Sequence, residues 1–224
     1  MLVNIAFLQK NAKIVLCILK VGLIMKTNNK HGFIFSIIAY LVVTFLDLYF
    51  TYVATPNLEL EGNPLYNVLF FGWTGLITIN VIAFLFYALI SYYAFIGYKR
   101  PVTNETDLRK YLSYISYGDA DKYSVGMWKL PKYWAPQIAC LCWSVAIILP
   151  FAKLFIVIVW YLLILDIPAP LFFDIVTAMP MGRIDLVVAV LGAWALSFVW
   201  IAREFRLNLK QIEKRKSEEG STCD

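Results

Sequence analysis

Four long apolar runs, separated by loops that are alternately basic and acidic, constrain this chain more than any other feature of its sequence. The runs cover residues 33–53, 68–98, 138–165 and 184–201. Each approaches or exceeds the ~20 residues that an α-helix needs to cross the hydrocarbon core of a bilayer. Composition agrees, because 61% of the residues are hydrophobic and only 16% are charged, which excludes an ordinary soluble domain. The sequence therefore predicts an all-α integral membrane protein with four transmembrane helices.

Lysine and arginine gather on every second connection. They lie before the first run, between the second and third, and after the fourth: Lys10, Lys13, Lys20, Lys26, Lys30; Lys99, Arg100, Arg109, Lys110, Lys122, Lys129, Lys132; Arg203, Arg206, Lys210, Lys214, Arg215, Lys216. The other two connections carry Glu59, Glu61, Asp166 and Asp174 instead. The positive-inside rule assigns the basic side to the cytoplasm. Both termini are therefore predicted to be cytoplasmic, in a multi-pass protein of the cell membrane.

These patterns divide the chain into three parts. Residues 1–30 form a basic amino-terminal segment, 33–203 a four-helix membrane domain, and 204–224 a charged cytoplasmic tail that we expect to be disordered at its end. Two interpretations of the first part remain open. It is either an interfacial helix whose lysines reach the headgroups, or a stretch that precedes the true start of translation at Met25.

The long basic connection contains one amphipathic pattern. Leu108, Tyr111, Leu112 and Ile115 recur at the i, i+3, i+4, i+7 spacing of a helix face. Thr106 is the expected N-cap, because its hydroxyl could accept a hydrogen bond from the first turn. The pattern predicts an interfacial helix in the cytoplasmic loop. In the last run, Ala189, Ala193 and Ser197 with Gly192 form a small-residue face that predicts close helix packing.

The first run carries an acid where charge is costly. Tyr40, Thr44, Asp47 and Thr51 follow one another at spacings of four, three and four, which places them on one stripe of a helix. A carboxylate inside a membrane either holds helices together through hydrogen bonds or contacts a solute or ion. Both interpretations remain open for Asp47.

Lys153 in the third run is too deep for its ammonium group to reach water easily. A cation at that depth requires a counter-charge, and Asp47 is the best candidate in the chain. We therefore predict an ion pair between the two residues, used either structurally or as a gated or proton-linked pair. The second run adds Asn80, which is polar and belongs to the same half of the membrane.

The first acidic connection contains Glu61, Asn63 and Pro64 just before the second run. Its acids either cap a helix amino terminus or join Asp47 in an acidic outer vestibule. Asp47 and Thr51 followed by Glu-x-Asn-Pro resembles the pattern of a family of small prokaryotic multi-spanning membrane proteins of unknown function. The resemblance covers residues 33–97. It implies a membrane fold and marks these positions, and it implies no particular reaction.

Several other classes of function are disfavoured. The chain has a single histidine, His31, so a histidine-based metal centre or catalytic triad is not expected. Cys17, Cys140, Cys142 and Cys223 fit neither a disulfide framework nor a zinc site. We expect no cofactor. The net charge of +5 comes from the cytoplasmic segments, where it meets lipid headgroups and indicates no nucleic acid.

Two functions remain ahead of the others. The first is a small transporter-like or solute- or ion-binding subunit with a polar outer-leaflet site lined by Asp47, Thr51, Glu61, Asn63, Asn80 and Lys153. Because four helices make a thin transporter, this function would require a homo-oligomer or a membrane partner protein. The alternative is a structural or accessory protein that docks partners. An intramembrane enzyme would need paired carboxylates, such as Asp47 with Asp174 or Asp185, and a non-enzymatic function is favoured over it.

Overall fold

The computed structural model describes residues 29–58, 72–122, 130–165 and 184–220. The regular secondary structure in these ranges is entirely helical: α2 (Asn29–Ala54), α4 (Gly72–Tyr92), the π-helical turn η1 (Tyr93–Gly97), α5 (Leu108–Tyr117), α6 (Ala135–Ile164) and α8 (Ile184–Gly220). Helices α2, α4, α6 and α8 are long and apolar enough to cross a membrane. The predicted all-helical fold with four helices able to span a membrane is therefore confirmed for the described residues, while the orientation and the interfacial placement of the loop helix stay predictions.

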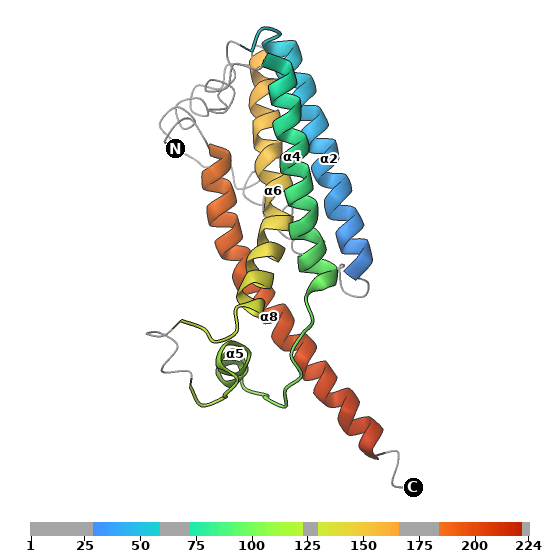
Figure 1. Cartoon of the computed structure of the whole chain (residues 1–224), viewed down its shortest axis with the longest axis vertical. Helices are drawn as coiled ribbons and strands as arrows, with labels where there is room; N and C mark the ends of the chain where they lie inside the picture. Colours follow the sequence, from blue (N-terminus) through green and yellow to red (C-terminus); the bar gives the residue numbers. More distant parts are fainter. Residues whose placement is uncertain (1–28, 59–71, 123–129, 166–183, 221–224) are drawn as a thin grey trace, which may run out of the picture.

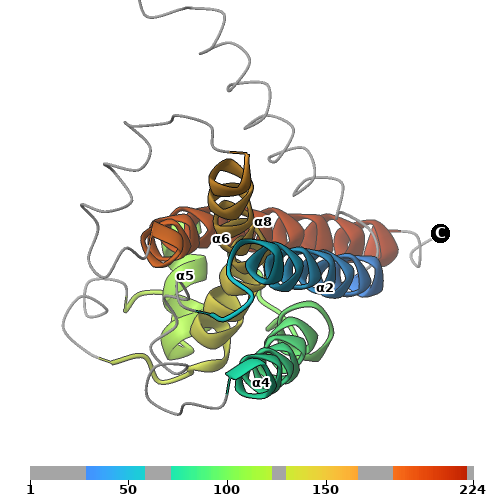
Figure 2. The ribbon, with the colours of Figure 1, turned by 90° about the horizontal axis from the view of Figure 1, so that it is seen from above.

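The three helices α2, α4 and α6 stand side by side, and α8 crosses α6 on another side (Figure 1). The carboxyl ends of α2 and α6 and the amino end of α4 lie at the upper end of this bundle, and the opposite ends of these helices lie at its lower end (Figure 1). The view from above shows α4 on the side of α6 that is farther from α8 (Figure 2). Helix α5 lies beyond the lower end, beside α6 and α8.

A tyrosine from α4 contacts both neighbouring helices, α2 and α6. The Tyr87 hydroxyl lies 2.6 Å from the carbonyl oxygen of Ala146 in α6 and 3.2 Å from that of Ser36 in α2. The Tyr87 ring also stacks on Tyr40 with ring centroids 4.1 Å apart. Because a buried hydroxyl without a partner is costly, these contacts fix the rotation of α4 about its axis. Asn80, about two turns higher on the same stripe of α4, consequently faces α2 and α6.

The apolar runs locate the helices but not their ends. α2 begins at Asn29, four residues before its run, and α6 begins at Ala135. The largest difference is α8, which continues as one helix to Gly220, through most of the charged segment 204–224. An apolar run marks only the part of a helix that lipid covers. The helix itself continues for as long as one of its faces packs against the rest of the protein. The amino-terminal segment 1–28 and the last four residues lie outside the described part of the chain.

The predicted helix of the long basic connection is present as α5, with a different cap. Its N-cap is Asp107, whose carboxylate accepts hydrogen bonds from the amides of Arg109 and Lys110 at 2.9 and 3.1 Å. Thr106 was the wrong residue, because the first turn begins at Leu108 and only the residue directly before it can reach those amides. Gly118 ends the helix with φ +76°, a left-handed conformation that favours glycine.

The small-residue face of α8 packs against α6, as predicted. The Ser197 hydroxyl lies 3.3 Å from that of Ser144 in α6. Gly192 is so close to α6 that a Cβ atom on it would overlap Cδ1 and Cγ1 of Ile148. The opposite side of α8 carries exposed large apolar side chains, among them Leu191 and Phe198, as expected for a surface that lipid covers.

Gly192→Ala should therefore destabilise the bundle. Alanine normally favours a helix over glycine by roughly 0.5–1 kcal/mol, but here its methyl group would displace Ile148 and should cost about 1–3 kcal/mol through overpacking. Thermal unfolding in detergent would measure the change. Gly97→Ala is the matched control, since a Cβ there would meet its nearest atom at an ordinary 3.4 Å. Equal effects of the two substitutions would contradict close packing at Gly192.

Candidate functional site

Three helices bring a lysine, an acid and an amide together in the upper half of the bundle. Lys153 Nζ in α6 lies 3.0 Å from Asn80 Oδ1 in α4 and 3.5 Å from Asp47 Oδ2 in α2. By helical rise, Asp47 is ~10 Å below the upper end of α2, which places the pair within the hydrocarbon span. The predicted contact between Asp47 and Lys153 is confirmed, and Asn80 joins it directly.

An aromatic ring completes this group, which we call the Lys153 cluster: Tyr40, Asp47, Asn80 and Lys153. The ammonium group of Lys153 lies 5.4 Å from the centroid of the Tyr40 ring, within the range of a cation–π interaction. The lysine thus has an anion, an amide oxygen and a π face around it. These three contacts together replace much of the hydration that a cation loses inside a membrane.

The charges of this cluster are mostly but not fully enclosed. The side chains of Lys153 and Asp47 are 16% and 17% exposed. Close by on the α2 stripe, the buried Thr44 hydroxyl has no hydrogen-bond partner within the described residues. A buried polar atom of this kind retains hydrogen-bonding capacity that the described protein groups do not use. The cluster consequently combines a compensated ion pair with at least one unused hydrogen-bonding group.

The remaining residues of the predicted site have different positions. Thr51 lies on the same stripe of α2, but its hydroxyl donates to the carbonyl oxygen of Asp47 in its own helix at 2.8 Å. Its hydroxyl is therefore satisfied within its own helix. Glu61 and Asn63 lie outside the described residues, and so does Asp174. Asp185 belongs to the first turn of α8.

Comparisons of the chain with protein-family models, curated proteins and solved structures found no match. The resemblance carried by Asp47, Thr51, Glu61, Asn63 and Pro64 therefore stays a prediction. Within the described ranges, no three His, Cys, Asp or Glu side chains lie close enough together to hold a metal ion.

A second charged group, at the lower end of the bundle, was missed by sequence reasoning. The carboxylate of Glu204 in α8 is only 2% exposed. It accepts hydrogen bonds from Arg100 Nε at 2.6 Å and Arg100 Nη2 at 3.2 Å, and from Arg203 Nη1 at 3.0 Å. We call Arg100, Arg203 and Glu204 the Glu204 cluster. The signal in the sequence is a stripe of every fourth residue that continues past the apolar run: Trp200, Glu204, Asn208 and Ile212, all buried.

This stripe attaches the charged part of α8 to the segment that follows α4. Asn208 Nδ2 donates to the carbonyl oxygen of Glu105 at 2.9 Å, and Arg215 Nη2 donates to that of Thr103 at 3.0 Å. The Tyr111 ring of α5 packs on Phe205 with centroids 5.6 Å apart. On the apolar side of α5, Tyr111 and Ile115 are buried and Leu108 is exposed, and the interfacial placement of this helix stays a prediction.

The electrostatics of the Glu204 cluster follow from its burial. Burial alone would lower the pKa of the Arg100 guanidinium, but its hydrogen bond and attraction to Glu204 leave that pKa raised. Burial, followed by the nearby Glu204 charge, raises the pKa of Tyr111 to about 12. The Tyr111 hydroxyl therefore stays protonated at physiological pH, and it is buried without a hydrogen-bond partner among the described residues.

Proposed function

We propose that this chain is a small membrane subunit that binds a solute or an ion at the Lys153 cluster, in the half of the bundle predicted to face outside. The observation that carries the proposal is the position of Lys153 Nζ between Asn80 Oδ1 and Asp47 Oδ2, each from a different helix. Ionisable residues within a membrane are expensive and characteristically mark solute or ion pathways.

Three features of the cluster support binding. The contact between Lys153 and Asp47 is long for an ion pair, at 3.5 Å, so that a ligand could replace either partner at modest cost. Both side chains retain some exposure, and Thr44 offers an unused hydroxyl. A charged solute would find the complementary charge, an amide and an aromatic ring within one site. Resemblance to the family of prokaryotic membrane proteins, a cell-membrane location and assembly into a homo-oligomer are parts of the same proposal.

A second function is favoured by one specific observation. Asp47, Asn80 and Lys153 come from α2, α4 and α6 and satisfy one another's charge and polarity. An ion pair that is closed in this way holds three helices in register without any ligand, as a structural or accessory membrane protein requires. Access of water to the cluster distinguishes the two functions, because a binding site must open to water and a structural lock need not.

Thiol labelling tests this access. In a variant without native cysteines, Thr44→Cys should react with a membrane-impermeant sulfonate reagent added from outside, because a site that binds a solute must be reached from water. The extent of modification is measured by mass spectrometry in intact cells or vesicles. A thiol at position 44 that stays unmodified even after permeabilisation would reject the binding function and support the accessory one.

Three control positions define the direction of access. Asn57→Cys is exposed at the upper end and should label from outside, and Asn104→Cys is exposed beyond the lower end and should label only after permeabilisation. Ser91→Cys, fully buried in the lower half of α4, should not label from outside. Outside labelling at position 104 would instead reverse the predicted orientation.

A further inference from the structure

We propose that the Glu204 cluster binds the phosphate group of an acidic phospholipid at the lower boundary of the membrane. The proposal rests on the charge, the depth and the surroundings of Arg100 and Arg203. It is independent of the Lys153 cluster, which lies in the other half of the bundle.

The first observation is an imbalance of charge. Arg100 and Arg203 both donate to the single carboxylate of Glu204. Each guanidinium carries five N–H donors, more than one carboxylate can accept, and the cluster keeps one net positive charge. The two arginine side chains are 21% and 25% exposed, whereas Glu204 is 2% exposed. The positive charge therefore faces outward and the negative charge inward, which favours an anionic ligand.

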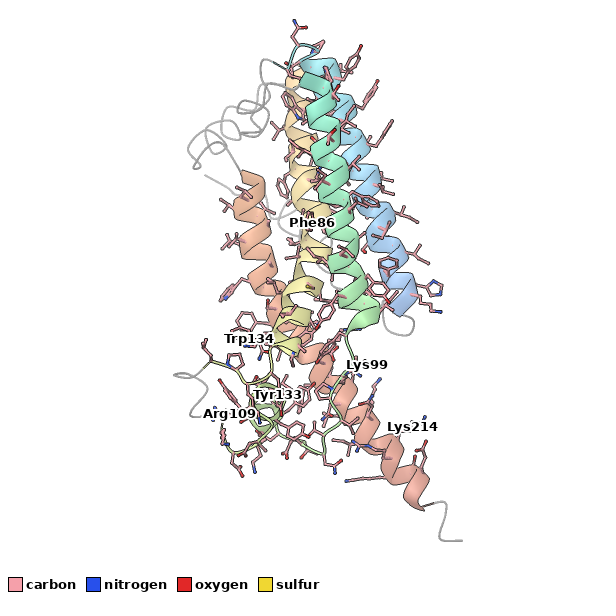
Figure 3. All side chains as sticks on the ribbon, viewed as in Figure 1. Phe86, Lys99, Arg109, Tyr133, Trp134 and Lys214 are labelled. Atoms are coloured by element: carbon pink, nitrogen blue, oxygen red, sulfur yellow. The ribbon has the colours of Figure 1, made fainter. Side chains whose placement is uncertain are left out.

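The second observation is depth. Arg203 follows the last apolar residues of the fourth run, and its guanidinium lies 5.8 Å from the centroid of the Trp143 ring in α6. Tyr133 and Trp134 lie exposed beside the start of α6, and Lys99 lies exposed at the lower end of α4 (Figure 3). Aromatic and basic side chains at one level are typical of the headgroup region, where lipid phosphates lie.

The third observation concerns the walls of the site. The Tyr98 and Tyr111 hydroxyls are both buried without a hydrogen-bond partner in the part of the chain that the structure describes. Both rings pack against α8, Tyr98 on Trp200 and Tyr111 on Phe205. They can supply neutral hydrogen-bond donors beside the two guanidinium groups, and phosphate oxygens accept from both kinds of donor.

The neighbouring apolar surface favours a lipid over free phosphate. Above the cluster, α6 and α8 are in contact where Cys140 meets Ser197. Both helices carry exposed apolar side chains within one turn of this contact along the chain: Ile138 and Leu141 on α6, Phe198 and Val199 on α8. An acyl chain can lie along this surface while its phosphate reaches Arg203. Inorganic phosphate would gain the charge interaction alone.

The test measures binding of short-chain phosphatidylglycerol to the full chain in a neutral detergent. Short-chain phosphatidylcholine serves as the zwitterionic control and inorganic phosphate as the free anion. We expect saturable binding of phosphatidylglycerol that is at least tenfold tighter than that of the other two. Arg203→Gln should weaken it by about tenfold, the expected loss for one charge-assisted hydrogen bond, because Arg100 still neutralises Glu204 in that variant.

Arg206→Gln, an exposed site three residues further along α8, is the matched control and should leave binding nearly unchanged. Equal losses in the two variants would reduce the effect to general surface charge and overturn the proposal. Equal affinity for phosphatidylglycerol and phosphatidylcholine would overturn it as well. Competition by inorganic phosphate at the same concentration as the lipid would identify a free-anion site in its place. If Arg203→Gln fails to fold, the affinities of the unsubstituted chain for phosphatidylglycerol, phosphatidylcholine and inorganic phosphate still test the proposal.

Discussion

Lys153→Met should lower the free energy of unfolding by on the order of 3 kcal/mol, because it leaves the Asp47 carboxylate without its cation inside the hydrocarbon span. Asp47→Asn should cost less, since Lys153 keeps its contact with Asn80 Oδ1 at 3.0 Å and with the Tyr40 ring. Unfolding in mixed micelles, followed by circular dichroism, measures both losses.

The double variant with both substitutions provides the decisive comparison. A methionine and a neutral amide bury no charge, so the pair of substitutions should recover much of the loss seen in Lys153→Met. Any solute binding at the cluster should stay absent in all three variants. Losses that simply add would show that the two charges are energetically independent despite their 3.5 Å contact.

Glu204→Gln should have an effect of similar size at the other end of the bundle. It removes the only carboxylate that the buried sides of Arg100 and Arg203 contact in the described ranges, and uncompensated charges in such a place cost about 3 kcal/mol or more. We expect a large fall in the free energy of unfolding. We also expect faster proteolysis within the segment after α4, because the ion pair between Arg100 and Glu204 holds that segment against α8. Limited proteolysis with mass spectrometry would locate the cleavage.

Glu213→Gln is the control, because this acid is exposed on the same helix and exposed charges contribute little. Adding Arg100→Met to Glu204→Gln should restore part of the stability, since it removes one of the two like charges. Unchanged stability in Glu204→Gln would mean that the contacts of Glu204 with Arg100 and Arg203 do not hold the segment after α4 against α8.

The contrast between the two clusters shows where sequence reasoning succeeds. Inside the hydrocarbon span, charges are so costly that each requires a partner, and the chain offers few candidates at matching depth. The pairing of Lys153 with Asp47 could therefore be predicted. Outside the span, water makes a partner unnecessary, so nothing in its chemical type distinguishes Glu204 from the exposed Glu213. Only the period-four stripe through Trp200 and Asn208 indicates that Glu204 is buried.

Individual hydroxyls were equally hard to assign. Thr51 lies on the predicted stripe, but a threonine in a helix can satisfy its hydroxyl on its own backbone, and it does so here on Asp47. Tyr40 was placed on the correct stripe, yet its role required the position of Lys153 in three dimensions. Helix faces follow from spacing, whereas the partner of each polar group depends on how neighbouring helices are rotated.

The uninterrupted length of α8 has a mechanical consequence. Its 37 residues form one helix, so the stretch within the membrane and the stretch beyond it tilt together as a rod. Beyond Glu204 the helix extends by ~24 Å, and a tilt of about 10° around that point would move its far end by ~4 Å. The contacts of Asn208 and Arg215 with the chain after α4 resist such a tilt. A ligand or partner that repositions α8 in the bilayer would consequently transmit its effect as a displacement on the basic side of the protein.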